Sequence, residues 1–141
     1  MIIPVTENNE KIWAKMCVDL WPNDKIEEFL IARKNGEYDN EFLYFYDEEF
    51  IGFLSLSIKN DYVEGTSSRP VGYIEGIYVI PKYRKKGIAK NMVEFAKKWS
   101  KENNCKQIAS DCLIDNNISR TFHNKIGFKE ANTIIHFVMD A

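Results

Sequence analysis

Apolar residues recur at helical spacing in the first part of the chain. Between residues 7 and 20 one stripe contains Ile12, Trp13, Met16, Cys17 and Leu20. This spacing predicts an amphipathic helix. Thr6 is expected to cap its start, and Pro22 is expected to end it. The spacing of Asp24 and Glu27 is that of a capping box, which predicts a second helix that ends at Gly36.

Strand-like and helix-like segments alternate in the rest of the chain. Aromatic and β-branched residues around an acidic turn at 42–58 predict a β-hairpin, and polar residues 61–71 predict a loop. The further expected elements are a strand at 72–79, a helix at 88–103, a strand at 107–112, a helix at 117–126 and a strand at 133–139. This order predicts an α/β fold, a mixed sheet with helices on its faces, in one domain over residues 1–141.

The predicted strand at 72–79 contains a carboxylate among apolar residues. A strict two-residue period gives it two faces, one with Tyr73, Glu75 and Ile77 and one with Ile74, Gly76 and Tyr78. A charge inside a sheet is costly without a partner or a cavity, so Glu75 either pairs with a buried cation or faces a bound amine. Asp111, near the end of the predicted strand at 107–112, has the same two alternatives. Gly76 marks a bulge or a close backbone approach, or is a glycine that the strand tolerates.

A basic turn joins this strand to the next helix. It consists of Pro81, Arg84, Lys85, Lys86, Gly87, Ile88 and Ala89. A helix start carries free N–H groups and partial positive charge, which bind phosphate, and a glycine lets the ligand approach the backbone. The R-x-x-G-x-A spacing is neither a P-loop nor a dinucleotide fingerprint. The order strand, proline, cations, glycine, helix favours a phosphate cradle over a turn that only solubilises a helix end.

Composition excludes several classes of protein. The 141 residues carry a net charge of −2, so no nucleic acid or anionic membrane is required as a partner. No apolar run reaches the length of a membrane span, and the first residues lack the cationic start of a signal peptide. Three scattered cysteines without a CxxC pair predict reduced thiols in a cytoplasmic protein. His123 and His136 are the only histidines, and no cluster predicts a metal site.

Two motifs in this order resemble a known family. Residues 72–128 are similar to the core of the GCN5-related N-acetyltransferases, whose R-x-x-G-x-A loop binds the pyrophosphate of acetyl-CoA. The segment from Asn116 to Phe128 resembles the second motif of that family. LWP at 20–22, the stretch 61–79 and SDCLIDNNIS at 110–119 are similar to the aminoglycoside 6′-N-acetyltransferases. The resemblance implies acetyl transfer from acetyl-CoA, as co-substrate, to the 6′-amine of an aminoglycoside, without a metal.

The resemblance also implies where acetyl-CoA binds. In the family the sheet is mostly antiparallel, and its fourth strand carries a bulge and splays from its neighbour to admit the pantetheine arm. The residues implied in cofactor binding are Ile77, Tyr78, Val79, Arg84, Lys85, Lys86, Gly87, Ile88, Ala89, Asn116, Ser119 and Phe122. For Asn116, a role as helix cap is equally compatible with the sequence.

An acidic pocket for the antibiotic follows from the same resemblance. Glu75 and Asp111 would hold the polycation, and either would take the proton of the amine as general base. Trp21 and Tyr62 would present aromatic surface to the sugar rings, although Trp21 is equally compatible with core packing. Asn132 stands where relatives carry an acidic residue, with Glu130 nearby. His123 replaces the family's tyrosine as general acid or is an ordinary surface histidine.

Alternative functions stay open at this point. The same fold would serve acetylation of a polyamine, peptide or protein amine. A non-catalytic module that binds acyl-CoA or the antibiotic would keep the turn at Arg84–Ala89 and Asn116 without turnover. A nucleic-acid module is disfavoured by the net charge. The resemblance also implies a homodimer, with the predicted strand at 133–139 pairing across subunits.

Overall fold

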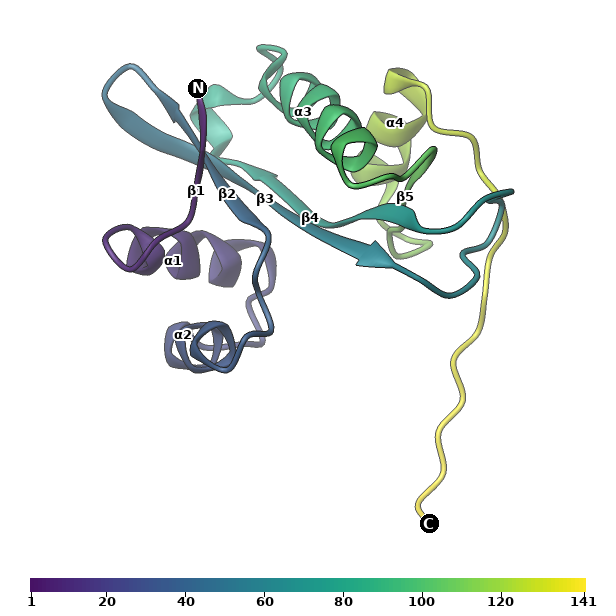
Figure 1. Ribbon diagram of the computed structural model, residues 1–141. Coiled ribbons are helices and arrows are strands. Elements are labelled where there is room, and N and C mark those ends of the chain that lie inside the picture. Colours follow the sequence, from purple (N-terminus) through teal and green to yellow (C-terminus); the bar gives the residue numbers. More distant parts are fainter.

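Five strands form one sheet with helices on both sides, as Figure 1 shows for this computed structural model of residues 1–141. The strands are β1 (Ile2–Pro4), β2 (Glu41–Tyr46), β3 (Glu49–Lys59), β4 (Val71–Val79) and β5 (Ile108–Ser110). The helices are α1 (Glu10–Leu20), α2 (Ile26–Lys34), α3 (Ile88–Glu102) and α4 (Asn117–Ile126), with a short 3-10 helix at Pro81–Tyr83. None of the helices combines the length and the apolarity that a membrane crossing requires.

The strands lie in sequence order, β1-β2-β3-β4-β5, and only the β4–β5 pair is parallel. The α1 and α2 helices lie on one face of the sheet, and α3 and α4 lie on the other (Figure 1). The predicted α/β class, with a mixed and mostly antiparallel sheet between helices, is therefore confirmed.

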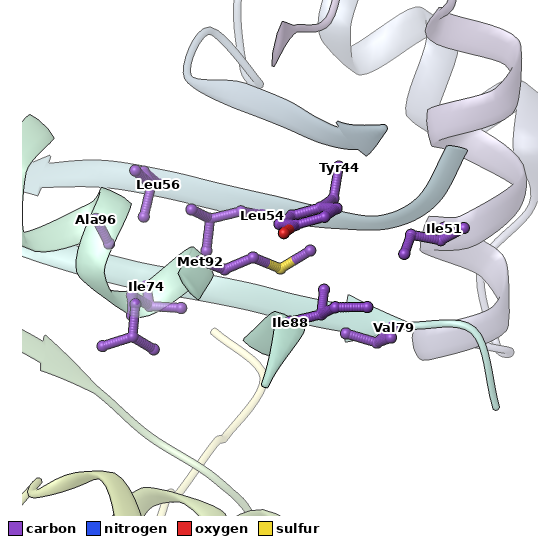
Figure 2. Close-up of a cluster of buried hydrophobic side chains, with 10 residues drawn as sticks. Tyr44, Ile51, Leu54, Leu56, Ile74, Val79, Ile88, Met92 and Ala96 are labelled. Atoms are coloured by element: carbon purple, nitrogen blue, oxygen red, sulfur yellow. The ribbon is translucent and has the colours of Figure 1, made fainter. Parts of the chain in front are cut away.

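Each face of the sheet has its own apolar core. On the α3 face, Met92 lies among the side chains of β3, β4 and α3, as Figure 2 shows. This cluster consists of Tyr44, Ile51, Leu54, Leu56, Ile74, Val79, Ile88, Met92, Val93 and Ala96. On the α1 face, Trp13 and Phe29 pack on Leu43, Phe53 and Tyr78. Burial of apolar surface on both faces fixes the sheet as a rigid platform.

A β-bulge at Glu75 changes the alternation of β4. Ser55 pairs with Gly76 and the next residue, Leu56, pairs with Ile74, so Glu75 is the extra residue. Ile74 consequently lies in the α3 core, whereas Tyr78 lies in the α1 core. The prediction that Ile74 and Tyr78 share a face was wrong, because it assumed an uninterrupted two-residue period.

The ends of the chain also differ from the predictions. Residues 133–139 do not form a strand, and Figure 1 shows the last residues leaving the body of the protein as an extended tail. No strand of this chain lies beside that segment, so Phe137 and Val138 are almost fully exposed. At the other end, Ile2–Pro4 forms β1 on the edge of β2, which the sequence pattern did not indicate.

Two predicted helix caps are absent, and one helix end is confirmed. The α1 helix begins after Asn9, and the Thr6 hydroxyl accepts from the backbone N–H of Asn8 instead. The α2 helix begins after Lys25 without a side-chain cap, so the predicted capping box does not form. Its end at Gly36 is confirmed, where a φ of 83° favours glycine.

Glu41 is a buried carboxyl group in the α1 core, with only 3% of its surface exposed. The Trp13 indole N–H donates to its Oε2 at 2.9 Å, and the Ser55 hydroxyl donates to its Oε1 at 2.6 Å. Burial raises the pKa of Glu41 to about 8, although both hydrogen bonds oppose this shift. The folded protein therefore keeps a proton that the unfolded chain releases near pH 4.5, and the free energy of unfolding falls as the pH rises from about 4.5 to about 8.

Glu41→Gln should remove this loss of stability. The amide keeps the shape, accepts from Trp13 and donates to Ser55, but it does not ionise. The free energy of unfolding of the variant, relative to wild type, should rise by roughly 1–3 kcal/mol between pH 5 and pH 8 in denaturant titrations. Glu94→Gln, at an exposed carboxylate on α3, is the matched control and should show no such trend. Parallel stability profiles for wild type and Glu41→Gln would contradict a proton on Glu41.

Candidate functional site

The turn before α3 has a free row of backbone donors. The first hydrogen bond of the helix runs from the N–H of Asn91 to the carbonyl of Gly87, and no acceptor in the protein meets the N–H groups of residues 85–90. Lys85 and Gly87 have left-handed backbone, with φ values of 61° and 81°. A side chain at Gly87 would meet no atom within 4 Å. This geometry leaves open space in front of unpaired donors at a helix start, which suits a phosphate group.

Arg84 is fixed by the end of β4 rather than free in the turn. Its Nε donates to the carbonyl of Val79 at 2.7 Å, and its guanidinium carbon lies 5.5 Å from the centre of the Tyr78 ring. Its charge is therefore held beside the turn, whereas Lys86 lies over the Tyr83 ring. Ile88 is buried in the α3 core and Ala89 packs against that core, so both anchor the helix start.

The outer edge of β4 is free over half of its length. The β4 strand pairs with β5 only from Gly72 to Ile74, whereas its pairing with β3 continues to Val79. The strands part at the bulge, so backbone groups from Glu75 to Val79 have no neighbouring strand on this side. The side chains of Ile77 and Val79 pack in the α3 core, and that of Tyr78 packs in the α1 core. An extended ligand can add to this edge as a strand does.

The start of α4 carries the second motif. The Asn116 side-chain oxygen accepts from the backbone N–H of Ser119 at 3.1 Å, so Asn116 is a helix cap. Phe122 is half-buried and packs against the α3 core. The structure thus uses these three residues to start α4 and attach it to the sheet.

His123 lies at the point where β4 and β5 part. Its Nδ1 lies 2.7 Å from the carbonyl oxygen of Ser119, which only accepts, so the neutral ring carries its proton on Nδ1. Its Nε2 then accepts from the hydroxyl of Ser110 at 2.9 Å, and the Ser110 oxygen lies 3.4 Å from the carbonyl of Ile74. The histidine is half-buried between Phe122 and Phe128, so it is not an ordinary surface residue.

Glu75 is partly exposed and partnered from β3. The Ser57 hydroxyl donates to its Oε1 at 2.7 Å, and the Nζ of Lys59 lies 2.8 Å from the same oxygen. The Glu75 side chain is 37% exposed and that of Lys59 is 44% exposed, so the cation is not buried. The alternative of a buried cation partner was therefore wrong, because the lysine that pairs with Glu75 is exposed. That Glu75 faces a bound amine stays a prediction.

Asp111 belongs to the same surface through Tyr73. The Tyr73 hydroxyl donates to Oδ2 of Asp111, and the Nζ of Lys59 lies 5.1 Å from the Tyr73 ring centre. Burial, the hydrogen bond to Asp111 and the negative charges of Asp111 and Glu75 raise the pKa of Tyr73. These contacts link Asp111 and Glu75 through Tyr73 and Lys59. We call this group the acidic face: Ser57, Lys59, Tyr73, Glu75 and Asp111.

Trp21 borders the acidic face at the bulge. Its ring stacks on Phe29 at 5.9 Å and lies 5.8 Å from Phe53, so part of it belongs to the α1 core. A side chain at Gly76 would come within 2.6 Å of the Trp21 ring. The glycine is therefore required by the close approach of the tryptophan, and Trp21 combines core packing with a half-exposed edge.

The loop before β4 is hollowed and exposed. Its open cavity of about 330 Å³ is lined by Tyr62, Thr66, Ser67, Ser68 and Arg69. Asn132 lies near this loop, and its side-chain amide donates to Glu64 at 3.0 Å. Glu130 is instead paired with Arg120, whose hydrogen bond lowers the pKa of Glu130 to about 2. Glu130 is thus already neutralised by a cation of the same chain.

Sequence reasoning missed Ser57, Lys59 and Tyr73 as parts of the acidic face. Ser57 pairs with Tyr73, and Lys59 is the last residue of β3. Their position depends on the β3–β4 register on the far side of the bulge. A polar Ser57 and Lys59 two residues apart at the end of an apolar strand were the available signal, since they must share a face.

Comparison with known proteins identifies the family. Residues 7–128 match the model of the acetyltransferase (GNAT) family. An aminoglycoside N(6′)-acetyltransferase type 1 from Acinetobacter haemolyticus is 35% identical, over 96% of this chain and 95% of the relative.

Two solved structures share the architecture. A complex of AAC(6′)-Iy with the bisubstrate analog CoA-S-monomethyl-acetylneamine superposes with a TM-score of 0.92 at 29% identity, covering 100% of this chain and 98% of that one. The apo aminoglycoside 6′-N-acetyltransferase AAC(6′)-IG from Acinetobacter haemolyticus has a TM-score of 0.92 at 33% identity, covering 100% and 99%. The family resemblance carried by the two motifs is confirmed, and the chain belongs to the acetyltransferase (GNAT) family.

Proposed function

We propose that this protein, over residues 1–141 as one N-acetyltransferase domain, transfers the acetyl group of acetyl-CoA to the 6′-amine of aminoglycosides. One observation carries the proposal: the free edge of β4 runs from a cradle of unpaired N–H groups at Gly87 to the acidic face at Glu75. A thioester carrier and a cationic acceptor can therefore meet at the bulge. The relatives that are similar over nearly the whole chain carry this activity in their names, which supports the choice of acceptor.

Acetyl-CoA fits the cradle and the free edge together. The N–H groups of residues 85–90 receive the pyrophosphate, and Arg84, Lys85 and Lys86 supply positive charge beside it. The pantetheine arm adds to the edge of β4 at Ile77–Val79, so that a backbone N–H polarises the thioester carbonyl. Asn116, Ser119 and Phe122 support this site by starting α4 and packing it on the sheet.

The reaction requires a neutral amine beside the polarised carbonyl. The amine nitrogen attacks the carbonyl carbon, a C–N bond forms, and the C–S bond breaks with the electron pair leaving on sulfur. The proton of the amine passes to Glu75 or Asp111, directly or through water. The thiolate takes a proton from the imidazolium form of His123, which carries a proton on Nε2 as well as on Nδ1 and is left as the neutral ring. Nε2 and the Ser110 hydroxyl lie where the strands part.

The acceptor site is acidic and aromatic, as a polycationic sugar requires. Glu75 and Asp111 attract the amines, the exposed edge of Trp21 lies beside them, and Tyr62 and Asn132 come from the loop and the tail that border the site. Acetylation removes a positive charge from the antibiotic, which would give a cytoplasmic enzyme a role in resistance. Acetylation of another amine is the second candidate, since the exposed acidic face accepts other cations.

A second copy of the chain is the proposed partner of the tail. Residues 133–139 have the composition of a strand, and most of them are apolar. Their side chains at Ile135, Phe137, Val138 and Met139 are exposed to solvent. We propose that they pair with the sheet of a partner subunit in a homodimer. Sedimentation of the full chain and of a chain ending at residue 131 should then report a dimer and a monomer.

The cradle is tested by Gly87→Asp. A carboxylate in the open space before the N–H groups should weaken acetyl-CoA binding by tenfold or more in calorimetry, because it competes with the pyrophosphate. Gly36→Asp is the matched control, since Gly36 has a φ of 83° and is equally unobstructed but lies at the end of α2. Both variants carry the same backbone strain, so unchanged affinity in a folded Gly87→Asp protein would refute the cradle.

The regiochemistry is tested by a pair of antibiotics that differ at one position. Neomycin B has an amine at the 6′-position and paromomycin has a hydroxyl there. Release of CoA should be at least a hundredfold faster with neomycin B, and tobramycin, kanamycin A and amikacin should also be acetylated. Gentamicin C1, which is N-methylated at that position, should be a poor substrate. Equal turnover of neomycin B and paromomycin, or turnover of spermidine alone, would contradict the proposed acceptor.

The two carboxylates are tested by their amides. Glu75→Gln should raise KM for tobramycin through loss of a charge and lower kcat by roughly a hundredfold through loss of a base. Asp111→Asn should mainly raise KM. Acetyl-CoA affinity should not change in either variant, because the cradle lies at the other end of the β4 edge. Wild-type kcat/KM in both variants would place the acceptor elsewhere.

A further inference from the structure

Lys59 is a cation within a face that is proposed to bind a cation. Its Nζ lies 2.8 Å from Oε1 of Glu75 and 5.1 Å from the centre of the Tyr73 ring. The ammonium group is therefore held by a carboxylate and by an aromatic face at once.

The two carboxylate oxygens of Glu75 differ in their contacts. The hydroxyl of Ser57 and the ammonium of Lys59 both engage Oε1, and no hydrogen bond from the protein reaches Oε2. The carboxylate is thus oriented from β3, and one oxygen remains available to an incoming N–H group. Ser57 and Lys59 occupy alternate positions of β3, so both reach the same face.

The other charges on this face favour a protonated amine. Asp111 and Glu75 are carboxylates, and a nearby negative charge stabilises the ammonium form of an amine. Tyr73 stays neutral, since burial and both carboxylates raise its pKa. Glu41, which accepts from Ser55 in the α1 core, keeps its proton up to about pH 8. Among the side chains in contact with Glu75, only Lys59 carries a positive charge.

Nucleophilic attack requires the opposite protonation state. An ammonium ion has no lone pair, so a face made only of carboxylates would bind the acceptor and slow its reaction. A fixed positive charge on the other side of Glu75 disfavours a second positive charge nearby. Lys59 thereby offsets the effect of the carboxylates on the acceptor amine without removing them.

We propose that Lys59 is a positioning residue, which holds Glu75 by Oε1 and promotes loss of the acceptor's proton near neutral pH. The inference deepens the proposed acetyl transfer and rests on it. It separates two roles on one face, because Glu75 and Asp111 recruit the polycation while Lys59 sets the protonation of the amine that reacts.

The experiment measures single-turnover acetyl transfer from acetyl-CoA to tobramycin by quenched flow, with both substrates saturating, between pH 5.5 and 9.5. Lys59→Met keeps the length of the side chain without its charge, and Lys59→Arg keeps the charge. Under saturation the rising limb of the rate with pH reports the bound amine and its base. The Lys59→Met limb should move to higher pH, which lowers the rate roughly three- to tenfold at pH 6.5 and leaves the alkaline plateau within about twofold of wild type. Lys59→Arg should follow wild type.

Two controls separate this role from stability and from the proposed function. Lys97→Met removes a similarly exposed lysine that pairs with Glu94 on α3, and it should leave the limb unchanged. Acetyl-CoA affinity should be the same in all variants. If wild type is active and its rising limb lies at the same pH as that of Lys59→Met, the role of Lys59 is overturned and the proposed function is not. The same holds if the only effect of Lys59→Met is a lower KM for tobramycin. A wild type that does not acetylate tobramycin overturns the proposed function and this inference with it.

Discussion

The bulge at Glu75 is the constraint on which the rest of the site depends. One extra residue in β4 moves the side chains beyond it to the opposite face, so Ile74 anchors the α3 core and Tyr78 anchors the α1 core. The pairing with β5 ends at Ile74, the residue before the bulge. A regular β4 would have put Tyr78 on the α3 face and removed it from the cluster around Phe53. The bulge therefore determines packing on both faces of the sheet as well as the free edge.

The neighbourhood of the bulge is rigid because its surroundings are closely packed. The Trp21 ring occupies the space that a side chain at Gly76 would need, and it stacks on Phe29 of α2. Behind it, the buried Glu41 links Trp13 of α1 to Ser55 of β3. The α1 helix and the β3 strand are thus connected on the side of the sheet away from the free edge of β4. A ligand can approach that edge without displacing any of these groups.

The sequence predicted the elements better than it predicted the contacts between them. Helical spacing and the run of cations before Gly87 depend on neighbouring residues, so α3 and the turn before it could be inferred locally. The faces of β4 could not, because a bulge needs knowledge of both strands. Lys59 and Tyr73 meet Glu75 and Asp111 only through the register of β3, β4 and β5. Residues 133–139 have the composition of a strand, but a strand needs a partner that this chain does not supply.

The carboxylates around the site also show why their number alone says little about binding. Glu130 resembles a site residue in sequence, yet Arg120 neutralises it within the same chain. Asp111 accepts from Tyr73, and Glu75 is engaged on one oxygen only. Attraction for a cation depends on the charge that remains after such pairing, and its reactivity depends on the positive charges that stay nearby. A net charge of −2 spread over 141 residues carries neither piece of information. The charge that remains after pairing and the positive charges nearby both depend on which strand carries each partner. They therefore depend on the bulge, which sets the register of β4 against β3.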